Sequence, residues 1–183
     1  MSYKSCFALA LVALSAPAAA IAQDVWRTPD GKPAAESPSR KAVNDFGVSL
    51  LVTADDWQSK WNTPSSTVPM FNAAARVKTG GTLSILTFVA NPKPAPSSNE
   101  LKVVSHIRVL RPDGSSSVDA PNLPCLRGTL QGPATNTRLC EAVIAFRADP
   151  GDQRGTWKVE VTVTDVNRSI AVPVEATFSV EGD

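Results

Sequence analysis

The sequence contains one histidine in 183 residues, and this scarcity argues against several kinds of catalytic site. A zinc site or a Ser-His-Asp triad needs a histidine that is oriented by neighbouring ligands or carboxylates. His106 lies in an alternating segment with no Cys, Asp or Glu at ligand spacing, so we expect a structural or surface role for it. The GxSxG, HExxH and SxxK motifs are also absent. We therefore expect no enzymatic activity, no cofactor and no metal; paired carboxylates for glycoside hydrolysis could be assembled in the fold, but nothing in the sequence selects them.

The chain also lacks an excess of charge of either sign. It has 18 Lys and Arg residues and 17 Asp and Glu residues, which gives a formal net charge of +1. Loss of an N-terminal leader containing Lys4 would bring the charge to about zero. A protein without net charge has no long-range field that gathers phosphate backbones or anionic lipids. The sequence therefore argues against binding to nucleic acid or to a membrane surface.

No long apolar run occurs after the first two dozen residues. The start of the chain combines Lys4, an apolar run over residues 7–14 and the small-x-small sequence Ala20-Ile21-Ala22 before Gln23. This pattern is typical of a secretory signal peptide and is too short for a membrane-spanning helix. Cys6 lies at the start of the apolar run, so the lipobox of a lipid-anchored protein is missing. We expect residues 1–22 to be removed and the protein to be periplasmic or secreted, without membrane insertion.

Cysteine is also scarce, with three in the whole chain. Cys125 and Cys140 are the two that follow the leader, and in an oxidising compartment such a pair predicts a structural disulfide. A metal thiolate pair or a redox couple fits poorly, because neither a histidine nor a CxxC spacing accompanies them.

The composition changes once along the remaining chain. Residues 23–45 are rich in Pro, Ser, Ala and charge, without apolar periodicity, and Trp26 is their one large apolar side chain. This composition predicts a flexible N-terminal arm. From residue 46 to residue 183 the pattern is uniform, which predicts one domain large enough to form its own core.

Within that domain, alternation of apolar and polar residues recurs at regular intervals. Residues 155–165 read GTWKVEVTVTD, which places a tryptophan and three valines on one face of an extended chain. Residues 115–137 show no such pattern and are expected to be irregular. The expected strands cover residues 46–53, 75–78, 82–90, 101–111, 138–146, 155–165 and 170–180. Seven to nine short strands with turn signals between them predict an all-β antiparallel sandwich.

The order of these segments resembles the end of an immunoglobulin-like domain, in which a short acidic turn and a Gly-x-aromatic sequence precede the sixth strand. Residues 77–89 are similar to that family's turn into its second strand. The resemblance covers residues 75–180 and implies an immunoglobulin-like sandwich of the bacterial secreted type. Tryptophan replaces the tyrosine whose hydroxyl makes the corner hydrogen bond, and the cysteines lie outside the strands that antibody domains bridge. The residues that carry the resemblance are Asp149, Asp152, Gly155 and Trp157.

Trp57 and Trp61 form the first candidate binding surface. A spacing of four places both indoles on one side of a helical turn, behind Asp55 and Asp56 as the helix start. Exposed, the pair could stack on sugar rings or hold an apolar side chain of a partner. Alternatively, the turn closes one open end of the sandwich and both rings are buried.

The loops at the two ends of the sandwich are the other candidates. In the implied topology, the proline-rich loop 91–99 lies beside residues 166–169, which brings Lys93 and Arg168 together for partner recognition. The opposite end collects Asp113, Asp149 and Asp152, which suit calcium but are equally ordinary turn residues.

These observations predict a non-enzymatic binding or accessory module of the bacterial cell envelope. It would recognise a protein partner through its loops or the tryptophan turn. A lectin-like or hydrolase-associated protein that binds an envelope glycan is the alternative, and a structural component of an envelope assembly is a third possibility. The candidate binding residues are Trp57, Trp61, Lys93 and Arg168.

Overall fold

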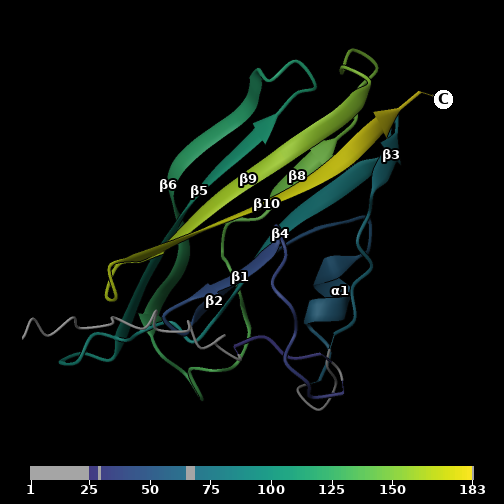
Figure 1. Ribbon diagram of the computed structural model, residues 1–183. Helices are drawn as coiled ribbons and strands as arrows, with labels where there is room; N and C mark the ends of the chain where they lie inside the picture. The colour runs from purple at the N-terminus through teal and green to yellow at the C-terminus, as the bar shows by residue number, and fades with distance from the viewer. Residues whose placement is uncertain (1–24, 29, 65–68, 183) are drawn as a thin grey trace, which may run out of the picture.

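The computed structural model describes residues 25–28, 30–64 and 69–182. Within them the chain forms ten β-strands, arranged in two sheets of five, and one short helix (Figure 1). The signal peptide expected at residues 1–22 lies outside the described residues. In the part of the chain that is described, no helix is long and apolar enough to cross a membrane.

The first sheet is entirely antiparallel. Strand β2 lies between β1 and β4, and the other edge of β4 pairs with β8 at its beginning and with β7 near its end. The strands are β1 (Arg40–Val43), β2 (Phe46–Thr53), β4 (Thr82–Ala90), β7 (Arg138–Leu139) and β8 (Ile144–Arg147).

The second sheet has the order β3-β10-β9-β5-β6, in which β3 and β10 are parallel and the other pairs are antiparallel. Its long strands cross over the first sheet with a strong twist, and one of the two sheets curls into a half-barrel (Figure 1). The strands are β3 (Arg76–Lys78), β5 (Glu100–Leu110), β6 (Ser116–Thr129), β9 (Gly155–Asp165) and β10 (Ile170–Glu181).

Strand β9 is the half-buried strand that its alternation predicts. It lies between β5 and β10, and Trp157, Val159, Val161 and Val163 are each at most 1% exposed in the core between the sheets. The Trp157 ring packs against Phe146 with ring centroids 5.0 Å apart. Its Nε1 donates to the carbonyl oxygen of the residue four positions upstream at 2.8 Å. The indole N–H therefore makes a backbone hydrogen bond of the kind that a corner tyrosine makes with its hydroxyl.

The predicted disulfide is present and connects the two sheets. Cys125 lies in β6 of the second sheet, and Cys140 directly follows β7 of the first sheet. Both side chains are buried, at 0% and 2% exposure. The disulfide thus joins strands that share no hydrogen-bonded ladder.

Two strands lie where the sequence pattern indicates none. Strand β1 falls inside residues 23–45 and pairs with β2 over four residues. Strand β6 covers most of the stretch expected to be irregular, but it pairs only with β5 and its register shifts three times. Both strands lie at a sheet edge, where one backbone edge of the strand and one face of the sheet meet solvent. Neither strand therefore needs the apolar–polar alternation that marks a half-buried strand.

Candidate functional site

The two tryptophans at helical spacing lie on the outer face of the first sheet. They are the first and last residues of the helix α1 (Trp57–Trp61). Asp56 is the N-cap of this helix, and its Oδ1 accepts from the Ser59 backbone N–H at 3.3 Å. The Trp61 ring packs on Phe88 of β4, with centroids 5.5 Å apart. Phe88 points away from the core, because its neighbour Val89 points into it. Neither tryptophan is buried or fully exposed, and α1 covers a sheet face rather than an open end of the sandwich.

Asp55 holds α1 to the segment that follows it. Its Oδ2 accepts from Lys60 Nζ at 2.7 Å and from the Asn72 backbone N–H at 2.7 Å. The hydrogen bond from Lys60, followed by the one from Asn72, lowers the pKa of Asp55 to about 2. Phe71 thereby lies on Phe88 as well, with centroids 5.8 Å apart.

The N-terminal arm covers the other end of the same sheet face. Trp26 Nε1 donates to the Lys41 carbonyl oxygen at 3.2 Å. The indole lies against β2 at Gly47, where an added Cβ would be 2.9 Å from Trp26 Nε1. A glycine at this position is therefore what allows the arm to approach the strand.

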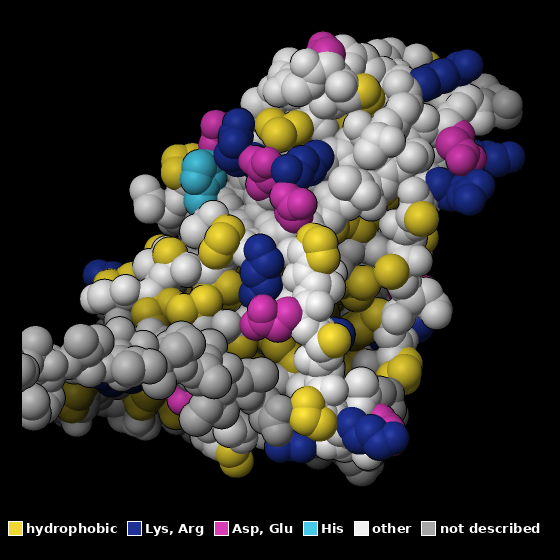
Figure 2. All heavy atoms as spheres, in the orientation of Figure 1, with side chains coloured by type: hydrophobic (Ala, Val, Ile, Leu, Met, Phe, Trp, Pro, Cys, Tyr) yellow, Lys and Arg dark blue, Asp and Glu magenta, His cyan; other side chains and the backbone are white. Residues whose placement is uncertain are grey.

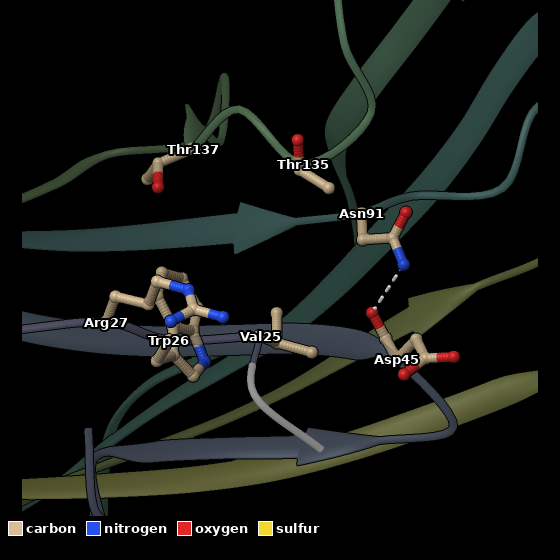
Figure 3. Close-up of a pocket in the computed structure, with 7 residues that line it drawn as sticks. All are labelled: Val25, Trp26, Arg27, Asp45, Asn91, Thr135 and Thr137. Carbon is tan, nitrogen blue, oxygen red and sulfur yellow. Dashed lines mark hydrogen bonds between the residues drawn. The ribbon is translucent and has the colours of Figure 1, made fainter. Parts of the chain in front are cut away.

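A groove of about 660 Å³ opens beside this tryptophan. Trp26 and the neighbouring arm residues form one side, the threonines of the 131–137 loop form the other, and Asp45 and Asn91 lie at one end (Figure 3). Asn91 Nδ2 donates to the Asp45 carbonyl oxygen at 2.9 Å, and the Asn91 backbone N–H donates to Ala134 at 2.8 Å. The groove is lined by Val25, Trp26, Arg27, Asp45, Asn91, Thr135 and Thr137.

The buried carboxylate of Asp165 helps to hold the loops that border the groove in place. Asp165, at 0% exposure, accepts the Lys93 backbone N–H at 2.8 Å, and its Oδ2 lies 3.5 Å from Arg168 Nε. The Arg168 guanidinium donates to the carbonyl oxygens of Asn44 and of Asn91, the latter at 2.9 Å. The structure thus brings the predicted pair Lys93 and Arg168 together. The side chain of Arg168 is 18% exposed and positions the two turns that border the groove.

The acidic turns meet at the opposite end of the sandwich, as the topology predicts. Asp113 Oδ2 accepts from Gln153 Nε2 at 2.6 Å, and this bond with those from Ser115 lowers the pKa of Asp113 to about 2. Asp152 Oδ2 accepts the backbone N–H of Asp149 at 2.9 Å. Within the described ranges no three His, Cys, Asp or Glu side chains converge as metal ligands.

The single histidine lies beside a chain of ion pairs on the outer face of the second sheet. His106 Nε2 lies 2.6 Å from Oδ1 of Asp119, which is on the neighbouring strand β6. Figure 2 shows the histidine in cyan, beside basic and acidic side chains. The remaining pairs are Arg108–Asp119 at 3.8 Å, Arg108–Glu160 at 2.9 Å, Lys158–Glu160 at 3.0 Å and Lys158–Glu175 at 2.7 Å. Three of these pairs join neighbouring strands, and Lys158–Glu160 lies along β9, so this surface is internally neutralised.

None of the four candidate binding residues chosen from the sequence lines the groove, and Trp26 was not among them. Its signal was present, because it is the one large apolar residue in a polar arm. Its neighbours Asp45, Asn91, Thr135 and Thr137 carry no distinguishing motif, and only the fold brings them together.

Comparisons with known proteins assign no family. No protein-family model matches the chain, and no curated protein matches it. Among the solved structures that resemble it, three do so over 74% of its length, each at low similarity. One is Pseudomonas fluorescens alkylpurine DNA glycosylase AlkC bound to DNA containing an abasic site analog, with 16% identity, a TM-score of 0.39 and 30% of that chain covered.

The other two structures are glycosidases. A family 123 glycoside hydrolase from Clostridium perfringens shows 10% identity and a TM-score of 0.37, with 27% of that chain covered. A β-glucosidase from Listeria innocua shows 10% identity and a TM-score of 0.36, with 16% covered. The chain thus spans less than a third of each of these proteins, and the likeness is that of a distant β-rich, two-sheet domain.

Proposed function

We propose that this protein is a non-enzymatic, exported binding module of a bacterial cell envelope that holds its ligand in the groove beside Trp26. The observation that carries the proposal is the groove itself. It gathers an indole ring and polar side chains from an arm and three separate turns into a hollow of about 660 Å³. Ligand sites combine apolar contact area with a few placed polar groups in this way.

The rigidity of this end of the sandwich supports the proposal. Arg168 binds the turns at Asn44 and Asn91, and Asp165 holds the start of the proline-rich loop. A binding site that is fixed before the ligand arrives loses less conformational freedom on binding. The role of Arg168 in this proposal is therefore to position the groove, while Lys93, whose side chain is exposed, lies at its periphery.

Export and an immunoglobulin-like topology belong to the same proposal. The buried Cys125–Cys140 disulfide is consistent with an oxidising compartment outside the cytoplasm. Strands β5, β9 and β10 are neighbours, as strands C, F and G are in immunoglobulin domains, and β2, β4 and β7 share the opposite sheet. This order supports the family resemblance seen in the sequence.

A protein partner at the outer surface of α1 is the second candidate. Met70, in the segment held by Asp55, is 65% exposed, and the adjoining Phe71 lies with Trp61 on Phe88. Exposed apolar side chains around aromatic rings are typical of protein-binding surfaces. Trp57 and Trp61 retain their proposed binding role in this alternative.

Site-specific photo-crosslinking tests both candidates. A benzophenone amino acid is introduced at Thr135, at Met70 or at Gly151, and the full chain is irradiated with an envelope extract of its source cells. We expect a discrete adduct from Thr135, of protein or glycan, and none from Gly151 at the far end of the molecule. An adduct from Met70 alone would select the second candidate. The absence of adducts from both Thr135 and Met70 would contradict the proposed function.

A further inference from the structure

We propose that the ligand of the groove is a neutral oligosaccharide, with one pyranose ring stacked on Trp26 and its hydroxyls bonded by Asn91 and Thr137. This inference rests on the proposed function and specifies its ligand class. It goes beyond the sequence expectation, which favours a protein partner and selects Trp57 and Trp61 for any contact with sugar.

Trp26 provides a stacking surface of fixed orientation. Its indole N–H is bonded to the Lys41 carbonyl oxygen, and its ring lies against Gly47 while also lining the groove. The electron-rich face of an aromatic ring attracts the polarised C–H groups on one face of a pyranose. A ring that is already held in place loses little freedom when a sugar stacks on it.

The polar groups around Trp26 suit sugar hydroxyls. The Asn91 amide nitrogen is bonded to the Asp45 carbonyl oxygen, and the amide oxygen lies on the other side of the amide group (Figure 3). Thr135 and Thr137 line the opposite wall, and in Figure 3 the hydroxyl of Thr137 points toward the arm whereas that of Thr135 points away from it. A hydroxyl both donates and accepts, and an amide oxygen accepts, so these groups complement the mixed donors and acceptors of a saccharide.

The charges of the groove favour a neutral ligand. Arg27 and Asp45 contribute one charge of each sign to its lining, and the whole chain carries a formal net charge of +1. A phosphate or a polyanion would be attracted by a cluster of basic side chains, and this lining has one arginine and one carboxylate.

The backbone around the groove disfavours an extended peptide. Peptides that add to a sheet need an unpaired strand edge. At the end of β4 nearest the groove, Ala90 pairs with Gly47 on one side, and Phe88 pairs with Leu139 on the other. Both edges of β4 are therefore occupied there, so a peptide in the groove could not add to this strand.

Titration of the full-length protein with defined glycans tests the inference. Isothermal calorimetry is performed with chitotetraose, cellotetraose, maltotetraose and mannotetraose. We expect saturable binding of at least one, weakened about tenfold or more by Trp26→Ala, because an aromatic contact contributes about 1 kcal/mol or more. Trp26→Phe keeps a ring and should retain most of the affinity. Thr137→Ala should weaken binding severalfold, and Thr177→Ala, at an exposed threonine of β10 in the other sheet, should leave it unchanged.

Two results would overturn the sugar assignment: no binding of any of the four glycans, or equal binding by wild type and Trp26→Ala with unchanged thermal unfolding. The proposed function would survive either result if crosslinking at Thr135 still yields a discrete protein adduct. The two hypotheses therefore fail separately.

Discussion

Gly47 lies directly under the indole of Trp26, with no space for a side chain between them. An added Cβ would be 2.9 Å from Trp26 Nε1 and 2.5 Å from Val25 Cγ1, closer than real Cβ contacts. Because Gly47 pairs with Ala42 of β1 on one side and with Ala90 of β4 on the other, the strand is held in place, and the arm must move instead. One wall of the groove therefore exists because this strand position has no side chain.

Substitution of Gly47 should detach the arm without unfolding the domain. In Gly47→Ala, Trp26 and Val25 are displaced, so trypsin should cleave after Arg27 faster than in the wild type. Gly151→Ala is the matched control, because a Cβ there meets nothing within 4 Å. Limited proteolysis followed by mass spectrometry measures both variants, and equal cleavage rates would contradict the packing of the arm on β2.

Removal of the buried carboxylate at Asp165 should destabilise the end that carries the groove. Asp165→Ala leaves the largely buried Arg168 without its counter-charge and removes the acceptor of the Lys93 N–H, at an expected cost of about 3 kcal/mol. Urea unfolding measures the loss, and amide exchange of Lys93 should accelerate. Asp119→Ala, which breaks an exposed pair, should change stability much less. A similar effect of both substitutions would mean that Asp165 has no special bracing role.

Loss of the disulfide should weaken the domain globally. The bridge closes a loop with a sequence separation of 15 and joins the two sheets, so Cys125→Ala/Cys140→Ala should lower the free energy of unfolding by about 3 kcal/mol. Chemical denaturation monitored by circular dichroism tests this, with dithiothreitol-treated wild type as the parallel sample. If the double variant unfolds at the wild-type urea concentration, the connection between the sheets contributes nothing to stability.

Acid should release α1 through Asp55. The folded-state pKa of Asp55 is lowered to about 2 from an ordinary value of 3.8, so its ionised form is favoured by folding. The resulting stabilisation is complete above about pH 4 and is lost as the pH falls toward 2. Asp55→Asn should therefore be less stable than wild type at pH 7, and the difference should shrink as the pH approaches 2. Unfolding midpoints measured across this range check the prediction, and a difference independent of pH would contradict it.

Much of the fold could be predicted from local pattern. The alternation of apolar and polar residues in 155–165 predicts a strand with one buried face, and Trp157 on that face is fully buried. The pairing of Cys125 with Cys140 followed from their being the two cysteines outside the leader. The edge strands β1 and β6 escaped prediction, because an edge strand is stabilised by a neighbour's backbone rather than by its own apolar alternation.

The candidate site divides in the same way. The sequence by itself determined a strand-rich domain, a helical turn with two tryptophans, and two sets of loops at opposite ends. Only the tertiary structure decided that Trp26 lies over Gly47, that Arg168 braces Asn44 and Asn91, and that these turns meet the 131–137 loop around a groove. The reason is physical: alternation and turn residues act over a few neighbouring positions, whereas the groove depends on contacts between segments that approach one another only when the two sheets pack.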